Sequence, residues 1–219
     1  MELSSQLFSD SWWWGMLIGL APLYWYAVRW ADFGRLVREG VSGAYFGSIV
    51  VLMLTWTLRT DVHAGIAWHL SGMVFITLAW GWSLALLAGL AAQFALVLAG
   101  LTELTSVVPT LWVLVILPAA LTQLVLGLVR AYLPKHFFVY VFVDAFFCGA
   151  LVAAVAVLAS VGLLVLAGQA WPPLRDDVMI LIPLMLFPEA FFNGLIITVL
   201  VTLRPQWVWS FRDEEYLSR

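Results

Sequence analysis

The sequence predicts an all-α integral membrane protein, a bundle of about seven transmembrane helices forming one domain over residues 1–219. Of these residues, 64% are hydrophobic and only 11% are charged, which lies outside the range of a soluble domain. The apolar residues gather in several runs near the roughly 20 residues that a helix needs to cross a bilayer. Basic residues are distributed unevenly between the links, and this sets the amino terminus outside and the carboxyl terminus in the cytoplasm.

Hydropathy and helix-breaking residues place the seven spans in order along the chain. The stretch from Ala64 to Gly100 is too long for one ordinary span and short for two, and we divide it at Trp80-Gly81-Trp82. The predicted spans lie near residues 12–29, 43–58, 64–80, 82–101, 109–129, 137–168 and 178–203.

The positive-inside rule supports this division. With seven spans, Arg59 and Arg175 lie outside, and the other eight basic residues lie in the cytoplasm: Arg29, Arg35, Arg38, Arg130, Lys135, Arg204, Arg212 and Arg219. Merging residues 64–100 into one span would leave four basic residues inside and six outside. All thirteen tryptophans also fall near predicted span ends, where indole rings prefer to lie.

The amino-terminal segment has the wrong charge for a secretory signal peptide. It contains Glu2 and Asp10 and no basic residue, so we expect it to be retained. The location expected for such a chain is the inner, cytoplasmic membrane, with membrane lipid around it and no nucleic acid partner.

Glu189, Asn193 and Asp144 fall inside predicted spans, where such polar residues are costly. Glu189, about eleven residues into the last span, lies near the bilayer midplane, and Asn193 is one turn later on the same face. These two residues fit either a polar site along a transport pathway or a protonated glutamate bonded to Asn193 for packing alone. Asp144, in the sixth span, is expected to have a structural pairing role.

His69 is the strongest candidate for a metal ligand. It lies about five residues into the predicted third span, roughly 8 Å below the outer surface. Imidazole nitrogen suits nickel, cobalt, copper or zinc, although a hydrogen-bonded structural histidine fits the same position. His63 and Asp61 precede it, and a shared site requires His63 to fold back from the loop, because a spacing of six is a poor match for one helical face.

Several short motifs resemble one family. The segment HLSGM at 69–73, the Gly/Ala-rich helices after it and FPEAFFNGLIITVLVTLRPQW at 187–207 are similar to the CbiM-type cobalt/nickel permeases of energy-coupling-factor transporters. The resemblance covers most of the chain in span order. It implies a substrate-binding permease that works with a transmembrane scaffold subunit and cytoplasmic ATPase subunits.

The resemblance also implies a metal site near the outer face. In that family the ligands are the free amino-terminal amine, a histidine at position two and a later histidine that matches His69. Glu2 stands at position two here, so the family site cannot be carried over whole. Glu2, His63 and Asp61 are the candidate substitutes for the missing ligand.

The predicted function is therefore the substrate-binding permease component of an energy-coupling-factor-type transporter for a transition-metal ion, with Ni, Co, Cu or Zn as substrate and no permanent cofactor. A phosphate-binding loop cannot form around the single lysine, because Pro134 precedes Lys135, so ATP must be hydrolysed by another chain. No HExxH or GxSxG motif is present, and we do not expect an enzyme. The alternative is a non-transporting scaffold or assembly subunit of a larger membrane complex.

Overall fold

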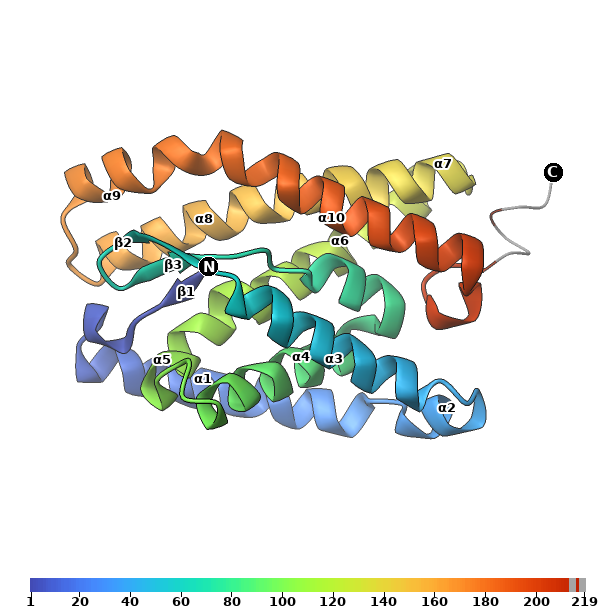
Figure 1. Cartoon of the computed structure of the whole chain (residues 1–219), viewed down its shortest axis with the longest axis horizontal. Coiled ribbons are helices and arrows are strands. Elements are labelled where there is room, and N and C mark those ends of the chain that lie inside the picture. Colours follow the sequence, from blue (N-terminus) through green and yellow to red (C-terminus); the bar gives the residue numbers. More distant parts are fainter. Residues whose placement is uncertain (213–215, 217–219) are drawn as a thin grey trace.

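The structure is a computed structural model that describes residues 1–212 and residue 216. In this part of the chain, long helices run side by side along the longest axis, and a three-stranded sheet lies at the end that holds the amino terminus (Figure 1). The strands are β1 (Glu2–Leu3), β2 (Thr60–His63) and β3 (Ile66–Trp68). The helices are α1 (Asp10–Trp30), α2 (Phe33–Arg38), α3 (Ser42–Thr57), α4 (Met73–Leu98), α5 (Leu104–Thr110), α6 (Leu117–Tyr132), α7 (Phe137–Val139), α8 (Cys148–Leu166), α9 (Trp171–Asp177) and α10 (Ile182–Leu203).

Within the described residues, four helical stretches are long and apolar enough by length and composition to cross a membrane, although Gly81 breaks the first of them. The shorter apolar helix α3 and the 21-residue α1 accompany them. The chain is therefore a multi-pass helical membrane protein, as its composition predicts, while the number of spans and their orientation stay predictions. The four stretches are Met73–Leu98, Leu104–Tyr132, Phe137–Leu166 and Trp171–Leu203, and π-helical segments at Leu111–Ile116 and Tyr140–Phe147 lie inside the second and third of them.

Gly81 interrupts α4 where the sequence predicts a division. Its φ of 78° and ψ of 169° are open almost only to glycine, so the residue breaks the helix. Just before the break, the Trp80 ring contacts Tyr45 near the beginning of α3. Beyond the far end of α3, Arg59 donates a hydrogen bond of 2.5 Å to the carbonyl oxygen of Leu101. The arm of α4 after Gly81 therefore lies along α3 and runs in the same direction as α3.

The predicted helix over residues 64–80 is wrong for its first part. Residues 60–68 form an antiparallel hairpin that turns at Ala64-Gly65, and β1 pairs with the other edge of β3. Ile66–Trp68 therefore satisfies its backbone groups on two neighbouring strands instead of in a helical turn. The partner strand lies some sixty residues earlier, so local hydropathy cannot reveal it. Helix α4 begins at Met73, and its first arm is too short to cross a bilayer, about 12 Å for eight residues.

Helix α10 has an exposed apolar stripe and a buried stripe at a spacing of about four residues. The buried stripe carries two polar residues among apolar ones and faces the bundle interior. It consists of Met185, Glu189, Asn193, Ile197 and Val201, and the exposed stripe consists of Leu184, Phe187, Phe191, Leu195, Val199 and Leu203. Helix α10 packs closely on α8 at Gly149, where an added Cβ would lie 2.9 Å from the carbonyl oxygen of Glu189.

Candidate metal-binding site

A small cavity lies beneath the sheet, between the amino terminus, the loop that precedes α4, and helices α6, α8 and α10. Its free volume of about 20 Å³ accommodates one water molecule or one metal ion. The polar part of its wall comes from Met1, His69, Ser71 and Glu189. The apolar part comes from Trp68, Val113, Leu114, Pro118, Val152, Ala153, Ala156 and Val157.

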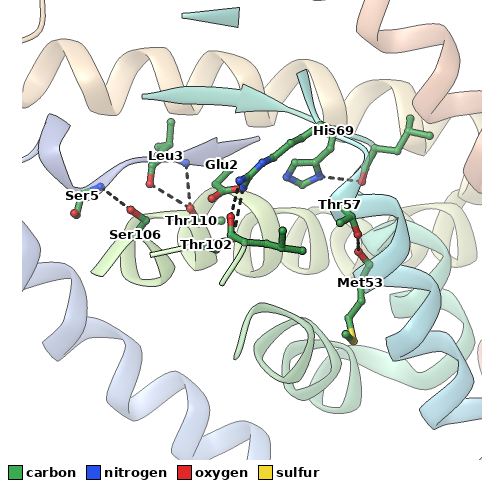
Figure 2. Close-up of polar contacts among 12 residues, drawn as sticks. Glu2, Leu3, Ser5, Met53, Thr57, His69, Thr102, Ser106 and Thr110 are labelled. Carbon is green, nitrogen blue, oxygen red and sulfur yellow. Dashed lines mark hydrogen bonds and ion pairs between the residues drawn. The ribbon is translucent and has the colours of Figure 1, made fainter. Parts of the chain in front are cut away.

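His69 lies in the loop between β3 and α4 and is only 2% exposed. Its Nδ1 is 3.1 Å from the carbonyl oxygen of Leu70, so Nδ1 carries the proton and donates (Figure 2). Its Nε2 has no hydrogen-bond partner in the described part of the chain. Burial, the largest cause, holds the pKa of His69 well below its usual value. The imidazole is therefore neutral with a free Nε2 lone pair, the form that binds metals.

The α-amino group of Met1 is the second nitrogen donor at the cavity. Burial lowers its pKa to about 6, against the opposing effect of the Glu189 carboxylate. The amine is thus mostly unprotonated at neutral pH, and its lone pair is available to a metal ion.

Strand β1 fixes the position of this amine. The N–H of Leu3 donates to Thr110 Oγ1 at 3.0 Å, and the Thr110 hydroxyl donates back to the carbonyl oxygen of Leu3 at 3.3 Å (Figure 2). The N–H of Ser5 donates to Ser106 Oγ at 3.1 Å. Together with the pairing of β1 to β3, these bonds tie the amino terminus to α5 and to the hairpin.

Glu189 and Asn193 reach from α10 to the loop that carries His69. One carboxylate oxygen of Glu189 accepts a short hydrogen bond from the N–H of Ser71, and the other accepts from Asn193 Nδ2 at 3.1 Å. The side-chain oxygen of Asn193 accepts from the N–H of Phe75 at 3.0 Å, in the first turn of α4. These bonds fix the direction of the Glu189 carboxylate, which is buried at 4% exposure.

Glu2 faces away from the cavity. Its carboxylate pairs with Arg59 at 2.5 Å, and the Arg59 side chain also reaches Leu101 and Thr102 (Figure 2). This pair lines a second, more open pocket of about 200 Å³ together with Asp61 and Glu103. The side chain at position two and the Met1 residue therefore line different pockets.

The remaining predicted residues lie apart from His69. His63 Nδ1 is 2.8 Å from Asp177 Oδ2, so this histidine joins the hairpin to α9 and does not fold back onto His69. Asp144 lies in the π-helical segment before α8, and neither of its carboxylate oxygens has a hydrogen-bond partner among the described residues. Within the described residues, no group of three histidine, cysteine, aspartate or glutamate side chains could hold a metal. A complete ligand set at this cavity therefore needs a donor besides these four kinds of side chain, and the amino-terminal amine is one that lines it.

A sequence model of the CbiM family, described as the cobalt uptake substrate-specific transmembrane region, matches residues 2–207. The chain belongs to the CbiM family. The predicted resemblance is confirmed over nearly the whole chain, and the CbiM chain is a membrane component of metal uptake. No curated protein and no solved structure matches it.

The structure of this CbiM chain shows two features that the residues alone could not place. Met1 and Glu189 meet at one cavity although 188 positions separate them, and no local pattern reports that contact. The second feature is the bond from the N–H of Ser71 to Glu189. Ser71 lies within the HLSGM motif, so that motif is the part of the sequence that points to this loop.

Proposed function

We propose that this chain is the substrate-binding permease component of an energy-coupling-factor-type transporter, and that it takes up a divalent transition-metal ion. The observation that supports this most directly is His69. A buried neutral imidazole with an unpartnered Nε2 lines a cavity the size of one ion, beside a second nitrogen donor. A buried acceptor without a partner costs roughly 1–3 kcal/mol, and a bound cation removes that cost.

The transition-metal class follows from the donors. Two nitrogen ligands favour cobalt, nickel, copper or zinc over magnesium or calcium, which prefer oxygen. The family description adds cobalt uptake, so Co²⁺ is the first ion to test.

The test is Co²⁺ and Ni²⁺ binding by purified protein in detergent, measured by equilibrium dialysis with metal analysis. His69→Ala should abolish stoichiometric binding. The matched control is His63→Ala, which removes the same side chain from the pair with Asp177 and should leave binding intact. Equal binding by His69→Ala and the unchanged protein would reject the proposal.

The amine is tested separately by adding two residues before Met1. The extension moves the free amine out of the cavity and replaces it with an amide nitrogen that cannot bind a metal in the same way. Binding should fall strongly, while the protein still elutes as one monodisperse species.

Partner subunits decide between transport and a scaffold role. The proposal predicts that the chain co-purifies with a transmembrane scaffold subunit and cytoplasmic ATPase subunits, and that metal enters cells only when the ATPases are active. A stable membrane complex that lacks any nucleotide-binding chain would favour the scaffold alternative.

A further inference from the structure

The cavity contains a third donor group besides the two nitrogen atoms. Glu189 belongs to the cavity wall, lies within α10 and is 4% exposed as a residue. In the part of the chain that the structure describes, it has no ion pair with lysine or arginine. The Met1 amine lies on the wall of the same cavity.

A carboxylate in such a place needs a positive charge close by. An isolated buried carboxylate costs several kcal/mol, and structures normally pair it or let it bind a metal. Among the described residues, neither lysine nor arginine pairs with this carboxylate, and His69 Nε2 at the same cavity has no hydrogen-bond partner. A divalent ion between the carboxylate, the amine and the imidazole would therefore supply the missing charge and complete the bonding of His69 Nε2.

The bonds to Glu189 have the form of a support for a metal ligand. Ser71 and Asn193 each donate to one carboxylate oxygen, and Asn193 is itself held by the N–H of Phe75. A carboxylate oxygen accepts in more than one direction, so each retains capacity for a further partner. Fixed outer partners of this kind orient the ligands of metal sites.

The side chain at position two cannot supply the third donor in this arrangement. The Glu2 side chain lines the neighbouring pocket and pairs there with Arg59 at 2.5 Å. Its pairing with Arg59 holds the strand that carries the amine, so Glu2 positions a ligand without being one. This division of roles accounts for a chain that lacks histidine at position two and still keeps His69 in the cavity.

We propose that Glu189 is the third ligand of the bound metal, which places one carboxylate oxygen beside the Met1 amine and His69 Nε2 in a two-nitrogen, one-oxygen site. This inference rests on the proposed function, because it assigns a further ligand to the same cavity. The substrate is a divalent transition-metal ion that accepts a mixed nitrogen and oxygen shell of net charge −1. Co²⁺ and Zn²⁺ both do so.

The decisive experiment compares Co²⁺ binding in Glu189→Gln and Glu103→Gln. The first variant keeps an oxygen that accepts the Ser71 N–H but removes the ligand charge. The second makes the same substitution in the neighbouring pocket, where Glu103 does not face the cavity. We expect Glu189→Gln to weaken Co²⁺ binding by about 100-fold or more and Glu103→Gln to bind as the unchanged protein does.

A spectroscopic measurement separates a ligand from a positioning residue. In the unchanged protein, Co²⁺ should shift an infrared carboxylate band, and this shift should be missing in Glu189→Gln and present in Glu103→Gln. Should Glu189→Gln not fold, Glu189→Asp replaces it: the shorter side chain keeps the charge but withdraws the oxygen, and binding should still weaken.

The outcomes separate the inference from the proposed function. The third ligand would be overturned if Glu189→Gln, or Glu189→Asp in its place, kept both the Co²⁺ affinity and the Co²⁺ infrared shift of the unchanged protein. Loss of binding in His69→Ala would still uphold the site in that case. No binding by the unchanged protein, or full binding by His69→Ala, would overturn both.

Discussion

The close contact between α8 and α10 at Gly149 gives the sharpest prediction about how the bundle holds Glu189. An added Cβ at Gly149 would lie 2.9 Å from the carbonyl oxygen of Glu189 and 3.1 Å from the Cα of Ala190. Ordinary contacts begin at 3.4 Å, so α10 would have to retreat by 0.5 Å, the difference between 3.4 and 2.9. The obstructing atoms belong to the backbone, so no rotation of a side chain can relieve the clash.

Gly149→Ala should therefore lower the free energy of unfolding by about 1–3 kcal/mol, the usual cost of overpacking. For a chain of this length, that corresponds to a fall in Tm of about 2–12 °C. The matched control is Gly162→Ala on the same helix, where an added Cβ meets nothing within 4 Å. This control should keep or slightly raise stability, because alanine favours helix over glycine by up to about 1 kcal/mol.

The assay is thermal unfolding of both variants in one detergent at one scan rate, followed by Co²⁺ titration. The displacement falls on the backbone of Glu189, so Gly149→Ala should also weaken Co²⁺ binding, by about tenfold, while Gly162→Ala should not. Equal Tm values for the two variants would refute the packing argument, and a lowered Tm with intact Co²⁺ binding would refute its link to the site.

Three further predictions concern the amino terminus. Burial lowers the pKa of the Met1 amine to about 6, and only the unprotonated amine binds a metal. Co²⁺ affinity, measured by dialysis, should therefore be level above about pH 7 and fall about tenfold for each pH unit below 6. An affinity that already begins to fall at about pH 8 would contradict this. Arg59→Met removes the partner of Glu2 at 2.5 Å, so Co²⁺ affinity should drop. The free energy of unfolding should change by about 1 kcal/mol or less, since the Arg59 side chain is 33% exposed. Thr110→Val keeps the side-chain shape but leaves the buried N–H and carbonyl of Leu3 without that partner. The free energy of unfolding, followed by thermal unfolding, should fall by about 1–3 kcal/mol, and the amine should be held less firmly. A variant as stable as the unchanged protein would show that these two bonds do not anchor β1.

Composition and charge placement predicted the membrane class and the division of α4 from the sequence. Gly81 lies between two tryptophans at a change of direction, and only a glycine adopts its φ of 78° and ψ of 169° readily. The hairpin was missed because Ile66–Trp68 reads locally as the start of an apolar run, and its stability depends on β1, far away in the sequence.

The polar residues that line the cavity stand out in the sequence, but their assembly at one place does not. His69 and the Glu189–Asn193 spacing stand out as polar groups in apolar surroundings, and this signal is local. The contact of Glu189 with Ser71 and its approach to Met1 are tertiary, over 118 and 188 positions. The sequence also offers His63 as a candidate ligand, and only the hairpin, which brings His63 to Asp177, shows where its side chain lies.

The most direct test of the central claim, that the His69 imidazole and the Met1 amine bind a transition-metal ion inside the bundle, is X-ray absorption spectroscopy of the Co²⁺-loaded protein. We predict a shell of nitrogen and oxygen atoms at about 2.0–2.2 Å, with the scattering pattern of one imidazole that disappears in His69→Ala. A shell of water oxygens alone, or an imidazole pattern that persists in His69→Ala, would contradict the account.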